Sequence, residues 1–337
     1  MQACTRIAGF CNVPATLATM TSLAFVFPGQ GSQSVGMGRD LATSSPAAAA
    51  VWATADDALG EPISRLAWEG PAEQLDLTEN AQPAILAASI AILEAWRERS
   101  GTAGWPRPDF AAGHSMGQYS ALVAAGVISL EDGIRLVRRR GELMQGSGQG
   151  RDGAMAALIG LDDARLPELV AAASRHGTFV VANRNAPGQV VVSGERAAIE
   201  AGADIAKGLG AKRAIVLPVS VAAHSPLMTE AADGMRDALA TVEVADPTTT
   251  LLANADAHRI TTGEAARTEL VEHLTAGVDW IAAVEHMTGA GVTTFIEVGP
   301  GKVLTGLIKR IAPDAEIVPA DDPASHDRLT ALAGSPA

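Results

Sequence analysis

Short apolar runs alternate with longer amphipathic stretches along most of the chain. Residues 23–27 are an apolar run that stops at Pro28 and Gly29, as a buried strand ends at a turn. Residues 130–145 have apolar side chains at helical spacing and follow a capping serine, Ser129. Strands that alternate with helices in this way predict an α/β fold with a mostly parallel sheet.

The middle of the chain carries a second, smaller pattern of the same kind. It predicts strands over 154–161, 178–183, 189–193 and 214–219, and helices over 162–175 and 197–209. The order strand, helix, strand, strand, helix, strand is typical of a ferredoxin-like unit. We therefore expect a small ferredoxin-like subdomain inserted into the larger α/β domain.

The glycine-rich stretch from Gly146 to Gly153 marks the clearest boundary in the chain. With this boundary, the pattern predicts a discontinuous large α/β subdomain over 23–147 and 217–312 and a small subdomain over 148–216. It also predicts a disordered N-terminal extension over 1–22 and a C-terminal tail over 313–337. The alternative to such an extension is an over-long start, with Met20 as the natural beginning of the protein. Because the tail is rich in proline and aspartate, we expect it to be loosely packed.

Composition predicts a packed core and an acidic protein. Of the 337 residues, 47% are hydrophobic and 19% are charged, which excludes disorder of the whole chain. There are 25 Lys and Arg against 38 Asp and Glu, so the net charge is −13. Because phosphate contacts need a basic surface, this balance argues against a general nucleic-acid-binding function.

Cysteine usage and the uncharged stretch near the N-terminus bear on location. The only cysteines are Cys4 and Cys11, so no disulfide framework holds the fold and a reducing cytoplasm is expected. Residues 7–38 carry no charge, but they contain prolines, glycines and glutamines rather than the run of about 20 apolar residues that a membrane span needs. Arg6 alone makes a poor start for a signal peptide. We expect a cytoplasmic protein without membrane contact.

The sequence Gly113-His-Ser-Met-Gly117 lies between a predicted strand, 109–113, and a predicted helix. A G-x-S-x-G in that context forms a tight turn that projects its serine from the end of a sheet. The N-terminus of the helix behind it offers unpaired N–H groups to a developing oxyanion. Ser115 is therefore a candidate nucleophile, and the alternative is a serine that only caps the helix.

A serine nucleophile needs a base, and His224 is the best candidate among the seven histidines. It follows the apolar run 215–219 in a loop, where the edge of a sheet would present it; a structural histidine is the alternative. No acidic residue between Ser115 and His224 is an evident third member of a triad, so we expect a backbone carbonyl to orient the ring. No His-Glu-x-x-His sequence is present, and we expect no metal site.

Two further features stay open on pattern alone. Residues 28–38 form a glycine-rich loop without dinucleotide or Walker spacing, so they either present backbone donors to a ligand or only turn the chain. On the helix over 130–145, Arg139 points away from the apolar face, while Arg138 and Arg140 flank it. An arginine turned inward would hold a carboxylate through two hydrogen bonds; a solvated face is the alternative.

Four motifs in one order carry a resemblance to a known family. They are Phe25-Val-Phe-Pro-Gly-Gln-Gly-Ser-Gln33, Gly113-His-Ser-Met-Gly117, Gln189-Val-Val-Val-Ser-Gly194 and Glu297-Val-Gly-Pro-Gly-Lys302. From about 23 to 312, the chain resembles the malonyl-CoA:acyl-carrier-protein transacylases and the related acyltransferase domains of polyketide synthases. That family has a hydrolase-like α/β core with a ferredoxin-like insert, which agrees with the pattern above.

The resemblance implies a role for each candidate residue. Ser115 takes the malonyl group, His224 is its base, and Arg140 clamps the malonyl carboxylate. Gln30 and Met116 supply the backbone amides of the oxyanion hole, where each donor is typically worth roughly 3–4 kcal/mol.

Three positions depart from the family's pattern. Gln118 stands where a glutamate is usual after the G-H-S-x-G sequence. Ala223 precedes the histidine where a serine or phenylalanine is common, a position that tracks acyl selectivity in polyketide enzymes. Asp279 stands where a glutamine supports the histidine through its carbonyl, and its backbone remains a candidate for that support.

The implied reaction is transfer of a malonyl group from malonyl-CoA to the phosphopantetheine thiol of an acyl carrier protein, by a ping-pong mechanism through a malonyl-serine ester. We expect no cofactor besides the CoA thioester substrate, and a monomer. An acidic carrier needs a basic docking patch, for which Lys302, Lys309, Arg310 and Arg184 are candidates. The alternatives are an acyl-thioester hydrolase, a trans-acting polyketide acyltransferase with a different acyl preference, and a non-catalytic carrier-docking module.

Overall fold

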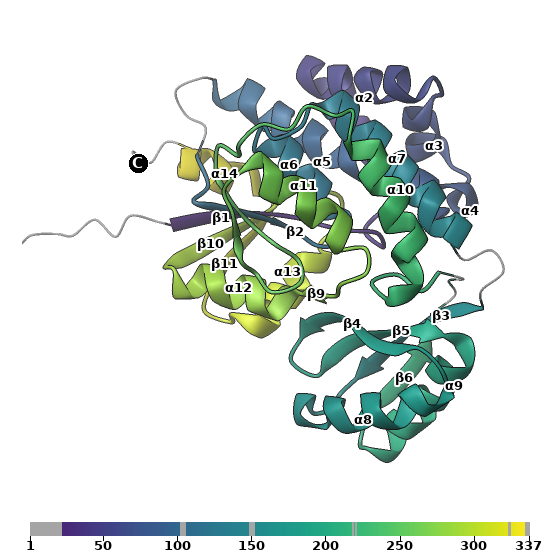
Figure 1. Ribbon diagram of the computed structural model, residues 1–337. Helices are drawn as coiled ribbons and strands as arrows, with labels where there is room; N and C mark the ends of the chain where they lie inside the picture. Colours follow the sequence, from purple (N-terminus) through teal and green to yellow (C-terminus); the bar gives the residue numbers. More distant parts are fainter. Residues whose placement is uncertain are drawn as a thin grey trace, which may run out of the picture.

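The computed structural model describes residues 22–101, 106–147, 152–217, 219, 221–322 and 325–333. Its larger sheet consists of β1 (Ser22–Phe27), β2 (Phe110–Gly113), β7 (Thr250–Leu252), β8 (Arg259–Ile260), β10 (Val292–Glu297) and β11 (Glu316–Pro319). The strands lie in the order β11-β10-β1-β2-β7-β8, and all neighbours are parallel except β7 and β8 (Figure 1). The predicted extension over 1–22 lies outside the described residues except for Ser22, which begins β1.

Fourteen α-helices and three short 3₁₀ helices are found in the described part of the chain. The α-helices are α1 (Arg39–Ser44), α2 (Pro46–Leu59), α3 (Ile63–Glu69), α4 (Ala72–Leu75), α5 (Thr78–Ser100), α6 (Gly117–Ala124), α7 (Leu130–Ser147), α8 (Leu166–Ala173), α9 (Arg196–Gly208), α10 (Thr229–Leu239), α11 (Gly263–Glu272), α12 (Trp280–Gly289), α13 (Val303–Ile311) and α14 (His326–Ala333). The 3₁₀ helices are η1 (Asp163–Arg165), η2 (Ser174–His176) and η3 (Pro226–Met228).

Side chains of β1 alternate between two hydrophobic cores, because successive residues of a strand point to opposite faces. Phe25 and Phe27 belong to the core that contains buried residues of α2, α5, α7 and α10. Ala24 and Val26 belong to the core with α12 and α13. Figure 1 shows these helices on opposite sides of the sheet, as a parallel sheet requires.

The smaller sheet is antiparallel over most of its width and lies below the larger one in Figure 1. Its strands are β3 (Gly153–Ile159), β4 (Phe179–Ala186), β5 (Gln189–Glu195), β6 (Arg213–Val216) and β9 (Val278–Asp279), in the order β6-β3-β5-β4-β9. With α8 and α9, the first four strands follow the predicted ferredoxin-like order, and the predicted fold class is confirmed. The subdomain boundaries stay a prediction, and β9 reaches this sheet from beyond residue 216 by pairing in parallel with β4.

The prediction of a loosely packed tail is wrong for the described residues beyond 312. β11 extends the larger sheet at its edge by parallel pairing with β10. Leu329 and Leu332, on α14, are buried in the same core as α5. The proline and aspartate content misled the prediction, because Pro313 and Asp314 lie in the turn before β11, while Pro319 ends that strand and Asp327 lies in the first turn of α14.

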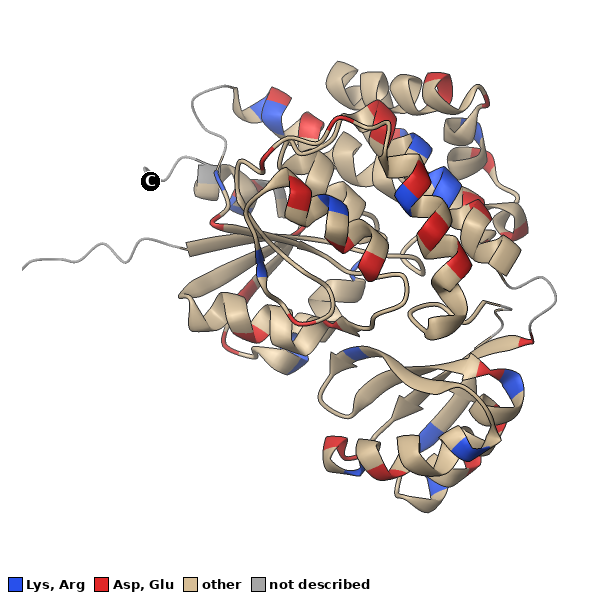
Figure 2. Cartoon of the chain, viewed as in Figure 1, with Lys and Arg blue, Asp and Glu red and all other residues tan. Residues whose placement is uncertain are grey.

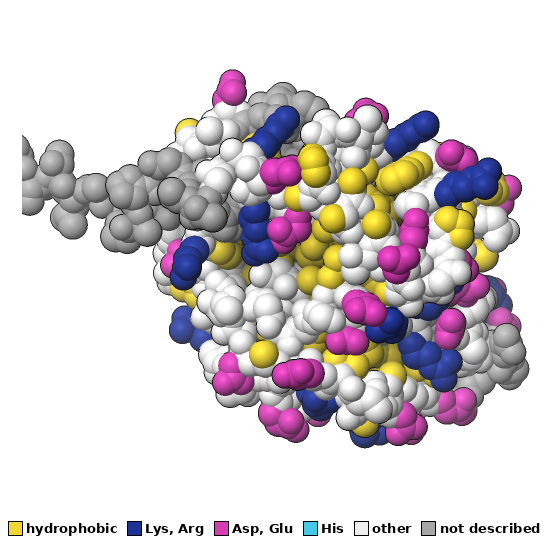
Figure 3. Space-filling model, turned by 90° about the horizontal axis from the view of Figure 1, so that it is seen from above, with side chains coloured by type: hydrophobic (Ala, Val, Ile, Leu, Met, Phe, Trp, Pro, Cys, Tyr) yellow, Lys and Arg dark blue, Asp and Glu magenta, His cyan; other side chains and the backbone are white. Residues whose placement is uncertain are grey.

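Charged side chains lie mainly on the helices and loops, and few lie on the strands of the larger sheet (Figure 2). On the face seen in Figure 3, acidic and basic side chains are interspersed with small apolar patches, without a continuous basic area among the described residues. Within the described ranges, every helix is too short or too polar to cross a bilayer.

Candidate active site

The turn that carries Ser115 is forced by the two glycines of the G-x-S-x-G sequence. β2 ends at Gly113 and α6 begins at Gly117, and Ser115 has a φ of 53°. A Cβ added at Gly113 would lie 2.0 Å from the carbonyl carbon of Gly117, and one at Gly117 would lie 2.2 Å from the carbonyl oxygen of Phe27. The strand and the helix therefore approach so closely that only glycine fits, and the serine between them sits on a strained bend.

We expect the Gly117→Ala variant to lose about 2–4 kcal/mol of unfolding free energy, because the added methyl group overlaps the β1 backbone. Urea denaturation followed by circular dichroism measures this loss. Gly306→Ala is the matched control: its Cβ meets nothing within 4 Å inside α13, so it is expected to gain up to about 1 kcal/mol. Wild-type stability of Gly117→Ala would contradict this account of the turn.

His224 lies next to the nucleophile, and its hydrogen bonds fix its tautomer. The distance between its Nε2 and Ser115 Oγ is 2.8 Å. Its Nδ1 is 2.7 Å from the carbonyl oxygen of His273 and 3.2 Å from that of Ala276. Because carbonyls only accept, Nδ1 carries the proton and Nε2 is free to accept the serine hydroxyl hydrogen. The prediction that a backbone carbonyl orients the ring is confirmed.

His224 is 4% exposed, and this burial is the main reason why its pKa is lowered to about 4. The positive charge of Arg140 lowers the pKa further, while the hydrogen bond to the His273 carbonyl opposes the shift. The ring is therefore neutral at pH 7, which is the state that a general base needs. Because unfolding restores the ordinary pKa, this histidine also makes the fold less stable as pH falls from about 6.5 toward 4.

The pH dependence of acyl loading follows from this pKa. We expect kcat/KM for malonyl-CoA to be flat above about pH 5.5 and to fall in acid with a midpoint near pH 4, rather than near the usual 6.5 of histidine. Single-turnover loading measured by quench and intact mass gives this profile without the carrier. Circular dichroism at each pH controls for unfolding, and a midpoint near 6.5 in folded protein would contradict the expectation.

Arg140 is 1% exposed and turns into the core from α7. Its Nη1 donates to Gln82 Oε1 at 2.9 Å, and its Nη2 lies 3.2 Å from Ser115 Oγ and 3.3 Å from His273 Nε2. Among the described residues, no carboxylate pairs with this guanidinium, and its Nε has no hydrogen-bond partner. Burying an unpaired charge is costly, so the site favours an anion beside the serine.

The other two arginines of α7 behave as the helical pattern predicts. Arg139, whose side chain is 53% exposed, pairs with Glu142 on the surface. Arg138 is half-buried and pairs with Glu61. Of the three, only Arg140 enters the site, so the alternative left open by the pattern is resolved in favour of an inward arginine.

Asn254 and Glu269 hold the backbone of the nucleophile in place, and the sequence analysis identified neither of them. Asn254, just after β7, accepts the Ser115 amide hydrogen at 2.8 Å. Glu269 is buried on α11 and accepts from the backbone N–H of Asn254 at 2.7 Å and from its Nδ2 at 3.2 Å. Burial raises the pKa of this carboxyl.

His273 was missed as well, although the sequence carries a signal for it. Ala266, Glu269, Leu270, His273 and Leu274 follow the spacing of a buried helical face, and all five are buried. Two polar residues on such a face indicate buried hydrogen-bonding groups rather than a solvated side.

The predicted oxyanion-hole residues lie around the same turn. Met116 directly follows the nucleophile and precedes α6. The loop that carries Gln30 packs against the turn, since a Cβ at Gly29 would lie 2.5 Å from the carbonyl oxygen of His114. In the described part of the chain, the backbone N–H groups of Gln30 and Met116 donate to no protein acceptor, while the Gln30 side chain donates to Thr78 Oγ1 at 3.3 Å. Both amides are therefore free to donate to a ligand.

The prediction that Asp279 supports His224 is wrong, because the carbonyls of His273 and Ala276 fill that place. The Asp279 carboxylate instead caps α12 by accepting from the Ala282 N–H at 3.0 Å. It also accepts from Arg184 Nη1 at 2.6 Å, across the pairing of β4 and β9. The Asp279 carboxylate therefore joins β4 of the smaller sheet to α12 and does not support the catalytic pair.

The hydrogen bonds of Gln118 explain why an amide suits the position where the family usually has a glutamate. Its Oε1 accepts from the Gly113 N–H at 3.1 Å, and its Nε2 donates to the carbonyl oxygen of Leu252 at 3.0 Å. An amide supplies both a donor and an acceptor, which an ionised carboxylate cannot. The His114 ring bonds Asn185 through Nε2 at 2.8 Å.

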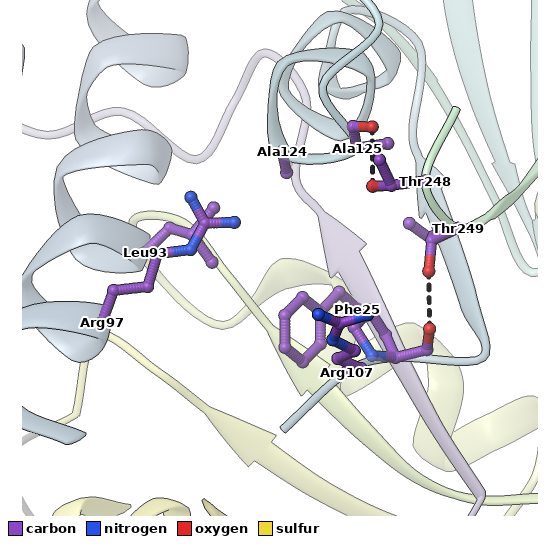
Figure 4. Close-up of a pocket in the computed structure, with 10 residues that line it drawn as sticks. Phe25, Leu93, Arg97, Arg107, Ala124, Ala125, Thr248 and Thr249 are labelled. Atoms are coloured by element: carbon purple, nitrogen blue, oxygen red, sulfur yellow. Dashed lines mark hydrogen bonds between the residues drawn. The ribbon is translucent and has the colours of Figure 1, made fainter. Parts of the chain in front are cut away.

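A cavity of about 300 Å³ lies at the opposite end of the larger sheet, near the starts of β2 and β7 (Figure 4). Phe25, Arg97, Arg107 and Thr249 are among its lining residues, and none of the lining residues belongs to the group around Ser115. Across the described ranges, no three His, Cys, Asp or Glu side chains come together as a metal site would need.

The four candidates for a docking patch differ in how free their side chains are. Arg184 is held by Asp163 and Asp279, and Lys302 pairs with Asp322 at 2.6 Å. Arg310 donates to the Pro187 carbonyl at 2.6 Å and to Gln189, and so ties α13 to the hairpin of β4 and β5. Lys309 is exposed and, within the described chain, makes no ion pair.

Comparison with known proteins places these features in a family. Residues 24–330 match the model of the acyl transferase domain family. Malonyl CoA-acyl carrier protein transacylases of Escherichia coli and Bacillus subtilis are 47% and 43% identical, over stretches that cover 87% and 90% of this chain and 93% and 95% of theirs. The crystal structure of an acyl carrier protein S-malonyltransferase from Vibrio cholerae has a TM-score of 0.88 at 43% identity, and covers 92% of this chain and 100% of that one. A structure of a type II PKS acyl-carrier protein in complex with its malonyl-transacylase contains a chain that matches with a TM-score of 0.88 and 42% identity, and covers 92% of this chain and 99% of that one.

Proposed function

This chain belongs to the acyl transferase domain family, among the malonyl-CoA:acyl-carrier-protein transacylases, and we propose that Ser115, His224 and Arg140 carry out the transfer. The substrates are malonyl-CoA and an acyl carrier protein. The observation that carries the assignment of residues is the buried Arg140 guanidinium, which lies 3.2 Å from Ser115 Oγ without a carboxylate partner among the described residues.

The first half-reaction forms a malonyl-serine ester. Ser115 gives its hydroxyl proton to His224 Nε2, and the serine oxygen attacks the thioester carbonyl of malonyl-CoA. The amides of Gln30 and Met116 hold the oxyanion of the tetrahedral intermediate. When the intermediate collapses, the carbon–sulfur bond breaks, and the CoA sulfur leaves with the proton from His224.

The second half-reaction runs the same chemistry in reverse with a different thiol. The phosphopantetheine thiol of the carrier gives its proton to His224 and attacks the ester carbonyl. The ester bond breaks, Ser115 regains its proton, and malonyl-carrier leaves. Throughout both halves, Arg140 holds the distal carboxylate of the malonyl group by charge-assisted hydrogen bonds.

A carboxylate clamp separates this function from that of a hydrolase for neutral acyl chains, which has no use for a buried cation. The test compares malonyl-CoA turnover with and without holo-carrier. We expect CoA release to be at least roughly tenfold faster with the carrier, because a transferase site excludes water from the ester. Equal rates would favour the acyl-thioester hydrolase.

The breadth of acyl preference is tested by initial rates with malonyl-, methylmalonyl- and acetyl-CoA and one carrier. Preference for malonyl-CoA supports the proposal, and preference for another donor supports the alternative of a trans-acting polyketide acyltransferase. We propose that Lys302, directly before α13, and Lys309, in its last turn, contribute to carrier docking. A monomer and a cytoplasmic location stay predictions.

A further inference from the structure

We infer that His273 is a positioning residue, whose ring fixes the orientation of Arg140; this inference rests on the function proposed above. The ring is 0% exposed, and its Nε2 lies 3.3 Å from Arg140 Nη2. The carbonyl oxygen of the same residue lies 2.7 Å from His224 Nδ1. One residue thus contacts both the carboxylate clamp and the base.

The direction of the contact with Arg140 follows from the chemistry of a guanidinium, which has five N–H donors and no acceptor. His273 Nε2 must therefore accept, and the ring proton lies on Nδ1. Nδ1 makes no hydrogen bond with described residues and lies 4.0 Å from Glu269 Oε1. Burial, and then the charge of Arg140, hold the pKa of His273 well below its usual value, so the ring stays a neutral acceptor.

Neutrality is what makes His273 useful beside Arg140. Gln82, on α5, accepts from Nη1, and His273, at the end of α11, accepts from Nη2. Both acceptors are uncharged, so they fix the plane of the guanidinium without cancelling its positive charge. A carboxylate in either place would form an ion pair and occupy the cation that the substrate needs. The site thereby keeps its charge available for the malonyl carboxylate.

Replacing the ring separates its role from that of the carbonyl, because the backbone of every variant keeps the contact to His224. We expect His273→Leu to lower kcat/KM for malonyl loading of Ser115 by roughly 10–100-fold, since the Arg140 guanidinium loses one of the neutral acceptors that orient it. Acetyl loading, which has no carboxylate to place, should change by less than about threefold. His273→Gln restores an acceptor and should keep the malonyl-to-acetyl ratio within about threefold of wild type.

The readout is this ratio, from single-turnover loading with each donor. An equal loss for both donors, or no loss for malonyl-CoA, would overturn the inference, since a merely structural role does not discriminate between donors. If His273→Leu does not fold, His273→Met fills the space with a flexible chain and is measured by the same ratio. Failure of the wild type to form a malonyl-Ser115 ester would instead overturn the proposed function itself.

Discussion

Replacing Ser115 with alanine is expected to abolish malonyl loading, with a fall of about 10⁴-fold or more in the rate of CoA release. The hydroxyl is the atom that becomes acylated, and no other nucleophile lies within hydrogen-bond reach of His224 Nε2 among the described residues. The oxyanion hole and Arg140 remain, but they only bind the substrate and do not supply the acceptor atom.

The matched control is Ser120→Ala, which removes a buried serine hydroxyl from the same helix, α6. That hydroxyl has no hydrogen-bond partner in the described structure, so its loss should leave loading unchanged. Loading is measured as CoA release and as the mass of the intact protein. Substantial loading of Ser115→Ala, at any residue, would contradict the assignment.

The second large effect is expected for Arg140→Ala, which should lower kcat/KM for malonyl loading by about 10²–10³-fold. This range lies within the cost of truncating one partner of a buried, hydrogen-bonded charge pair, which is typically about 2–5 kcal/mol. Loading of acetyl-CoA should be retained or improved, because the neutral donor no longer has to lie beside an uncompensated cation.

Arg139→Ala controls for the loss of an arginine from the same helix. Its side chain lies on the surface and pairs only with Glu142, and such exposed pairs contribute little. We expect wild-type loading of both donors by this variant. If Arg140→Ala lost malonyl and acetyl loading equally, Arg140 would support the fold rather than the substrate, which thermal unfolding of the variant would show directly.

The nucleophile and the base could be predicted from the sequence because their signals are local. The two glycines around Ser115 are required because an added Cβ would lie only 2.0 or 2.2 Å from backbone atoms, so the same short motif specifies both the turn and the nucleophile. His224 follows a strand run into a loop, and it too has a positive φ, 58°. Each prediction needs only one segment of chain.

Arg140 could be narrowed down but not chosen from the pattern alone. It flanks the apolar face of α7 as Arg138 does, and a helical projection does not show which of the two side chains turns inward. What separates them is the neighbour: Gln82 and His273 come from distant segments and surround Arg140, while Glu61 holds Arg138 near the surface. The family resemblance supplied the choice that periodicity could not.

The supporting residues were missed for the same physical reason. His273 lies 133 residues from Arg140, and Asn254 lies 139 residues from Ser115. Their pairing depends on how β7 and α11 return to the site, which no local pattern specifies. Asp279 shows the converse error, since a motif position was carried over while its side chain caps α12 and pairs with Arg184.

The most direct test of the account is peptide-level mass spectrometry of wild-type protein after brief incubation with malonyl-CoA. We predict a malonyl ester on Ser115 that disappears when holo-carrier protein is added, with the malonyl group recovered on the carrier thiol. An adduct on another residue, or an ester that the carrier cannot discharge, would contradict the claim that this serine passes the acyl group between the two thiols.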